Sequence, residues 1–265
     1  MERKKFVSEP YSVLVRPLAK ALITPKNYLR VISQPAWPFR TAWMLLRLAR
    51  AGQSQRDFIT GLVPGLNERS ADDALAELRS NVALYEHVKD GMDAVLELTQ
   101  GRIPGWMPLV QAEALYVLVR GLRPSRIVET GVGHGMSTTF ILQALADNNS
   151  GQLHSIDVPI RMRVDEHPSG CLVPDHLKDR WDLVLGESKT ELPPILSKLD
   201  SVDIFLHDSD HSAENMDFEY QEAWPHVVKG GLMLTDDIGP EFVRFGDRVN
   251  HRIARFNRLG GFTRN

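Results

Sequence analysis

Cysteine is almost absent from this sequence, and so are long uninterrupted apolar runs. Cys171 is the only cysteine among the 265 residues, which excludes an intramolecular disulfide and a cysteine-based zinc finger. This cysteine usage fits a reducing compartment, and we expect a cytoplasmic chain. Residues 11–48 contain many apolar side chains. Prolines and basic residues interrupt them before they reach the ~18 consecutive apolar residues of a membrane-spanning helix.

Acidic residues are scarce at the N-terminus. The first fifty residues hold ten basic and two acidic side chains, a net charge of +8, whereas the remainder of the chain carries −11. Because the acidic remainder would repel phosphate groups, we do not expect a nucleic-acid partner. The basic segment, which also contains tryptophan and tyrosine, predicts either peripheral contact with an anionic membrane surface or packing against the acidic part of the chain. Both interpretations stay open.

The chain divides into three predicted regions: a basic arm over residues 1–65, a helical extension over 66–106 and an α/β domain over 107–265. Apolar residues spaced by three and four between 71 and 99 predict amphipathic helices. Beyond residue 125, short apolar segments alternate with helix-length segments. The expected strands lie near 127–128, 153–158, 181–185, 202–206 and 232–234. This alternation is typical of a doubly wound, mostly parallel, Rossmann-like sheet.

A glycine cluster follows the first of these strands. Glu129 ends the strand, and Gly131, Gly133 and Gly135 precede the next helix. Glycines at such a turn let the backbone approach a ligand closely, at the edge where open α/β sheets bind cofactors. The spacing is not that of a dinucleotide fingerprint, which would require glycine where Met136 stands.

Asp157, at the end of the second strand, is placed to accept hydrogen bonds from both hydroxyls of a ribose. Together, the glycine turn and this acid resemble the class I S-adenosylmethionine-dependent methyltransferases over roughly residues 107–250. The resemblance implies the following cofactor contacts: Glu129, Gly131 and Gly133 at the methionine portion, Asp157 at the ribose, Gly186 and Ser188 near the adenine, and Asp208.

Three carboxylates follow two later strands. Asp208 ends one strand, and Asp236 and Asp237 end the next, 28 residues later. Neighbouring parallel strands end at the same edge, so these side chains are expected to lie together. Clustered carboxylates repel one another unless a cation is present, and oxygen ligands favour Mg²⁺ or Mn²⁺. The alternative is that these aspartates cap the helices that follow.

The acidic pattern resembles the metal-dependent O-methyltransferases that act on sugars of natural products and related glycans. The resemblance implies metal ligation by the three aspartates and a general base at His211 or Asp210, with His207 more simply explained by packing. It implies a hydroxyl acceptor on a sugar, glycolipid or small molecule. Such proteins usually end in an antiparallel strand pair, but only nine residues follow the helical segment expected near 242–256. We therefore expect a shortened C-terminal end or one very short final strand near 261–264.

Two other functions stay open at this point. A nicotinamide-dependent oxidoreductase could use a similar sheet, although no Tyr-x-x-x-Lys pair is evident. A non-catalytic binding module could retain the fold without the chemistry. Whether the chain forms a homo-oligomer is also open.

Overall fold

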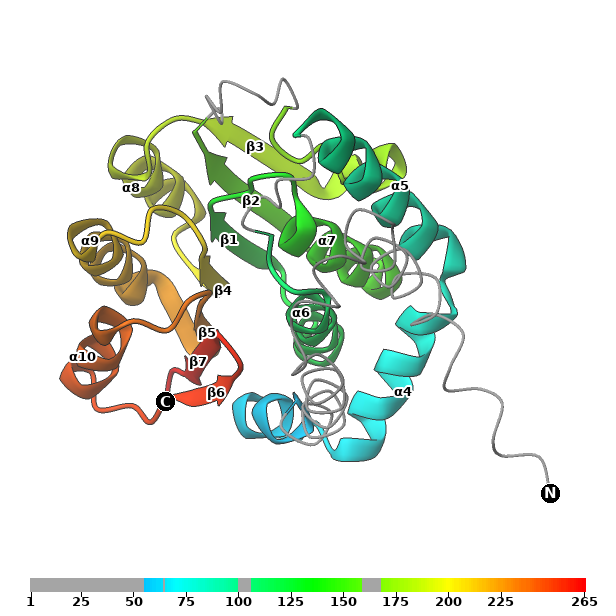
Figure 1. The fold of residues 1–265 in the computed structure, drawn as a ribbon. Helices are drawn as coiled ribbons and strands as arrows, with labels where there is room; N and C mark the ends of the chain where they lie inside the picture. Colours follow the sequence, from blue (N-terminus) through cyan, green and yellow to red (C-terminus); the bar gives the residue numbers. More distant parts are fainter. Residues whose placement is uncertain (1–54, 64, 100–105, 159–167) are drawn as a thin grey trace, which may run out of the picture.

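We describe a computed structural model of the chain over residues 55–63, 65–99, 106–158 and 168–265 (Figure 1). Most of the predicted basic arm lies outside these ranges, as does part of the loop after the second strand. The predicted membrane contact of the arm therefore stays a prediction. Among the described residues, no helix combines the length and the apolar character that crossing a membrane requires.

The central sheet has seven strands in the order β3-β2-β1-β4-β5-β7-β6. The first five pair in parallel, and β7 is antiparallel to both β5 and β6. The strands are β1 Arg126–Thr130, β2 Gln152–Asp157, β3 Trp181–Leu185, β4 Val202–His207, β5 Val227–Thr235, β6 Ala254–Phe256 and β7 Leu259–Thr263. The predicted doubly wound, mostly parallel fold is confirmed. The strand order reverses between β1 and β4, where sheets of this kind bind ligands.

Helices cover both faces of the sheet (Figure 1). They are α4 Glu68–Ser80, α5 Val82–Leu98, α6 Leu109–Leu122, α7 Met136–Asn148, α8 Ser188–Leu199, α9 Ala213–Ala223 and α10 Pro240–Arg248, with short 3-10 helices at Asp175–Arg180 and Trp224–His226. Alternate strand residues face opposite layers. Ile127 of β1 joins the core beneath α6 and α7, whereas the neighbouring Val128 joins the core beneath α8, α9 and α10.

The helices of the predicted extension contribute to the same core as α6 and α7. Leu78 of α4 and Val88 of α5 are buried in that cluster. Glu113 of α6 is almost fully buried, and it accepts hydrogen bonds from the Arg79 guanidinium (2.8 Å) and the Tyr85 hydroxyl (2.8 Å). Both contacts offset the cost of burying this carboxylate. They attach α4 and α5 firmly to α6.

The expected shortening of the C-terminal end was wrong. Instead of one short strand near 261–264, the chain forms the antiparallel pair of β6 and β7. Phe256 pairs with Leu259, so only two residues make the turn, and Asn257 adopts a left-handed conformation (φ 56°). Asparagine tolerates this conformation better than most residues. A hairpin this tight needs few residues, which is why the short remaining sequence suffices.

Candidate cofactor and catalytic site

The glycine turn after β1 brings the chain directly against the end of β4. Gly131 has φ 84°, and a Cβ atom there would lie 2.0 Å from the carbonyl oxygen of Asp208. The Gly131 N–H donates to the carbonyl of Ile156 (2.8 Å), while the Asp208 N–H donates to the carbonyl of Thr130 (2.8 Å). Only glycine meets both the conformation and the close approach. The turn therefore joins the ends of β1, β2 and β4 at one edge of the sheet.

Glu129 lies beneath this turn and is fully buried. Its carboxylate accepts hydrogen bonds from the hydroxyls of Ser137 (2.6 Å), Thr138 (2.8 Å) and Ser155 (2.8 Å). Burial raises the pKa of Glu129 to about 7, against the opposing effect of the three hydroxyls. Glu129 thus ties β1 to the start of α7 and to β2. It is not among the residues that line the neighbouring cavity.

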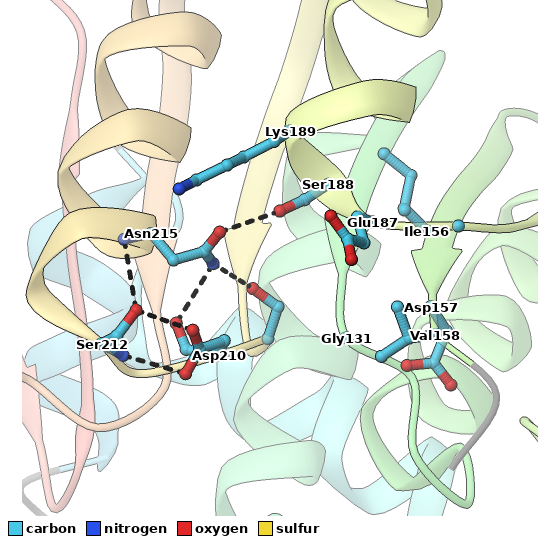
Figure 2. Close-up of a pocket in the computed structure, with 12 residues that line it drawn as sticks. Gly131, Ile156, Asp157, Val158, Glu187, Ser188, Lys189, Asp210, Ser212 and Asn215 are labelled. Atoms are coloured by element: carbon cyan, nitrogen blue, oxygen red, sulfur yellow. Dashed lines mark hydrogen bonds between the residues drawn. The ribbon is translucent and has the colours of Figure 1, made fainter. Parts of the chain in front are cut away.

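A cavity of about 350 Å³ opens at this edge, between the ends of β1, β2, β3 and β4 (Figure 2). Four of the seven predicted cofactor residues line it: Gly131, Asp157, Gly186 and Ser188. Its lining residues are Gly131, Ile156, Asp157, Val158, Gly186, Glu187, Ser188, Lys189, Ser209, Asp210, Ser212 and Asn215. The other three predicted cofactor residues, Glu129, Gly133 and Asp208, are not among the residues that line the cavity.

Asp157 presents an oxygen atom with no partner. Its side chain is only 7% exposed, and its Oδ2 atom is buried without a hydrogen-bond partner among the described residues. Burial raises the pKa of Asp157, and the Ser169 hydroxyl together with the backbone N–H groups of Val132 and Gly133 opposes that shift. An unpaired buried carboxylate oxygen is costly. A ligand hydroxyl that donates to it would remove the cost.

The opposite wall of the cavity is built around a buried carboxylate that the sequence analysis did not single out. Glu219 of α9 is fully buried. It bonds to the Nδ1 atom of His207 (2.6 Å), the hydroxyl of Ser209 (2.6 Å) and the side-chain amide of Asn215 (2.9 Å), and it also accepts from Thr130. Burial alone would raise the pKa of Glu219, but His207 and the other donors lower it below its ordinary value. Such a network fixes the β4–α9 loop.

Asn215 connects the Glu219 hydrogen-bond network to the surface of the cavity. Its amide nitrogen donates to Ser209 (3.0 Å), and its amide oxygen accepts from the hydroxyl of Ser188 (3.1 Å) at the start of α8 (Figure 2). Ser188, a predicted cofactor position, is therefore held by a residue from a different helix.

The two candidate bases occupy different environments. Both carboxylate oxygens of Asp210 accept from Ser212, one from its backbone N–H (3.1 Å) and one from its hydroxyl (2.6 Å). These contacts lower the pKa of Asp210 and commit it to the start of α9. His211 instead faces the acidic cluster: its Nδ1 lies 3.3 Å from Asp237 Oδ2 and its Nε2 lies 3.9 Å from Asp208 Oδ1.

The structure brings Asp208, Asp236 and Asp237 together, as their spacing predicted. The Asp236 side chain is 3% exposed and the Asp237 side chain is 34% exposed. Burial raises the pKa of Asp208 well above its usual range, and the charges of Asp236 and Glu129 raise it further. Burial also raises the pKa of Asp236. Asp237 adopts a left-handed conformation, with φ 54°.

A basic residue that the sequence analysis missed enters the same cluster. Arg258, in the turn between β6 and β7, pairs with Asp237 through its Nε and Nη2 atoms. Its Nη2 atom also lies 3.2 Å from Asp236 Oδ2. The only signal in the sequence was an arginine in a short C-terminal segment, with nothing to connect it to residues 21 and 22 positions earlier.

A divalent cation does not fit the cluster as the structure has it. Arg258 already pairs with two of the three predicted ligands. Within the described ranges, no group of three or more histidine, cysteine, aspartate or glutamate side chains is arranged to hold a metal ion. Arg258 occupies both oxygens of Asp237 and Oδ2 of Asp236, which leaves Oδ1 of Asp236 buried without a partner among the described residues. The carboxylates therefore meet, but with Arg258 in place they offer fewer free oxygens than Mg²⁺ or Mn²⁺ requires.

Comparison with known proteins finds a family match over part of the chain and similar solved structures. Residues 128–238 match a protein family described as a methyltransferase domain. The O-methyltransferase TomG of Streptomyces achromogenes, solved with S-adenosylmethionine, is 16% identical, with 68% of this chain and 90% of TomG covered and a TM-score of 0.51. No curated protein matches the sequence.

Two further solved structures are similar. A methyltransferase of Geobacter sulfurreducens is 21% identical, with 67% of this chain and 89% of that protein covered and a TM-score of 0.47. An O-methyltransferase of Bacillus cereus, solved with S-adenosylhomocysteine, is 14% identical, with 66% and 91% covered and a TM-score of 0.48.

Proposed function

We propose that this chain is an S-adenosylmethionine-dependent methyltransferase that methylates a hydroxyl group of a sugar, glycolipid or other small molecule. The observation that carries the proposal is the cavity at the ends of β1, β2 and β4, where Asp157 offers an unpaired buried oxygen beside the glycine turn. The family match over residues 128–238 favours methyl transfer over the nicotinamide alternative.

The residues of the cavity fit S-adenosylmethionine. Asp157 would accept hydrogen bonds from the ribose hydroxyls, and the backbone at Gly131 lines the cavity. Gly186 and Ser188, at the turn after β3, would contact the adenine end. When bound, this cofactor supplies an electrophilic methyl group on a positively charged sulfur.

We propose His211 as the general base. A neutral alcohol is a weak nucleophile, and a nearby imidazole can take its proton as the new bond forms. Asp237 lies 3.3 Å from Nδ1 of His211 and would hold the ring so that Nε2 accepts the proton. Asp210 is the weaker candidate because both of its carboxylate oxygens are bonded to Ser212. Metal assistance is not part of the proposal, because the aspartates do not fit a cation.

Radiolabelled methyl transfer tests this function. The full chain is incubated with S-adenosylmethionine labelled in the methyl group and with sugar, glycolipid and phenol acceptors. We expect transfer to a hydroxyl, and His211→Ala should reduce turnover by about 10²-fold or more. His226→Ala is the matched control, because His226 is partly exposed, does not line the cavity and bonds to a backbone carbonyl, that of Asp200 (3.0 Å).

Two results would contradict the proposal. Labelled product in which the methyl group is attached to nitrogen or carbon would reject the hydroxyl acceptor. Equal turnover of the His211 and His226 variants would remove His211 from the reaction.

A further inference from the structure

A positively charged side chain stands where the sequence predicted a metal ion. Arg258 pairs with Asp237 through two nitrogens, and its Nη2 lies 3.2 Å from Asp236 Oδ2. We propose that Arg258 replaces the divalent cation in this chain, holding Asp236 and Asp237 so that the enzyme positions its base and acceptor without a bound metal. This inference rests on the proposed methyltransferase function, which it deepens.

The backbone of Arg258 is fixed on both sides. With its amide oxygen turned toward the hairpin, Gln111 of α6 accepts from the backbone N–H of Arg258 (3.1 Å). The carbonyl of Arg258 accepts from the backbone N–H of Ile238 (2.9 Å), next to the acidic pair. Gln111 is fully buried. The guanidinium therefore extends from a backbone that two other elements hold in place.

The pairing also suits the charge of the cluster. Asp236 is almost fully buried, and leaving such a carboxylate without a counter-charge beside Asp237 would be costly. A guanidinium carries a permanent charge and a planar set of donors that matches a carboxylate. Arg258 thus meets the electrostatic demand that led the sequence analysis to a cation.

Asp237 connects Arg258 to the proposed base, His211, because its carboxylate contacts both side chains. The same carboxylate that pairs with Arg258 lies 3.3 Å from Nδ1 of His211. Arg258 is therefore a positioning residue: it fixes Asp237, and Asp237 orients the ring of His211. The side chain of Asp237, whose backbone is left-handed (φ 54°), contacts both Arg258 and His211.

Titration of the full chain with Mn²⁺, followed by electron paramagnetic resonance, tests the proposal without measuring activity. The variant is Arg258→Gln, which removes the charge, and the matched control is Arg255→Gln, an exposed arginine of the same hairpin. We expect no Mn²⁺ at the cluster in the wild type or in the control. Arg258→Gln should bind one Mn²⁺, at least about tenfold more tightly than any Mn²⁺ bound weakly elsewhere on the wild type, because it frees Asp236 and Asp237. Adding Asp236→Asn should remove that site.

Each other result overturns the proposal. One Mn²⁺ bound by the wild type and lost in Asp236→Asn would mean that a metal displaces Arg258. Equal Mn²⁺ binding by Arg258→Gln and wild type would mean that the arginine does not occupy a cation site. If circular dichroism shows that Arg258→Gln is unfolded, Mn²⁺ binding by the wild type and by Asp236→Asn still tests the proposal. Mn²⁺ that the wild type binds and Asp236→Asn does not would overturn it. Failure of methyl transfer would leave these binding results unchanged, so the two proposals fail separately.

Discussion

Replacing Glu129 by glutamine should change how the stability of the protein depends on pH. Glu129 is fully buried, and burial raises its pKa from an ordinary value of 4.5 to about 7. Between these two values the folded protein holds a proton that the unfolded chain has released. The free energy of unfolding therefore falls as the pH rises through this window. At 1.36 kcal/mol for each unit of pKa, the free energy of unfolding falls by about 3 kcal/mol as the pH rises from 4.5 to about 7.

Glutamine keeps the shape of Glu129 but does not titrate. The free energy of unfolding of Glu129→Gln should therefore rise relative to wild type by about 2 to 3 kcal/mol between about pH 5 and about pH 8. Urea unfolding followed by circular dichroism at each pH measures this difference. Glu97→Gln, at an exposed position of α5, is the control and should follow the wild type. If wild type and Glu129→Gln keep a constant difference across the range, the assigned burial effect is wrong.

Three further substitutions test other parts of the account. Gly131→Ala would place a Cβ atom 2.0 Å from a backbone carbonyl oxygen. Urea unfolding should therefore show a loss of about 1 to 3 kcal/mol in the free energy of unfolding, and calorimetric titration should show weaker cofactor binding. Glu219→Gln removes the charge that pairs with buried His207; thermal unfolding should show a loss of about 1 to 3 kcal/mol. Asp237→Asn should lower kcat by about tenfold or more with little change in KM, since Asp237 orients the base rather than binding the acceptor.

Each of these substitutions has a matched control. Gly61→Ala adds a Cβ atom at a helical position with no neighbour within 4 Å, and it should leave binding unchanged. Glu222→Gln on α9 and Asp247→Asn on α10 repeat the other two exchanges away from the networks. Full stability of Glu219→Gln would show that the buried network is not needed. Unchanged kcat in Asp237→Asn would show that His211 is positioned by other means.

The sequence predicted the elements whose signals are local. Strands 1 to 5 are short apolar segments between helix-length segments, and this alternation was enough to establish a parallel sheet. Asp157 and Gly131 could be paired because each stands at a strand end, and strand ends share an edge in this fold. The same reasoning brought Asp208 and Asp237 together, since it depends only on topology.

Contacts that depend on tertiary packing were not predictable in the same way. Strand β6 has three residues, too few for an alternating pattern to show. The pairing of Arg258 with Asp237 then depends on where this hairpin folds back against the sheet. Glu219 likewise reads as one of several acidic residues on α9, and only burial against His207 distinguishes it.

Calorimetric titration with S-adenosylmethionine tests the central claim most directly, since the account requires a nucleoside cofactor in the cavity beside Asp157. The full chain should bind the cofactor, and Asp157→Ala should weaken binding by about 10- to 100-fold through loss of charge-assisted hydrogen bonds to the ribose. Asp182→Ala, at an exposed position of β3, should bind like the wild type. Absence of binding by the wild type, or equal affinity of Asp157→Ala and wild type, would contradict the account.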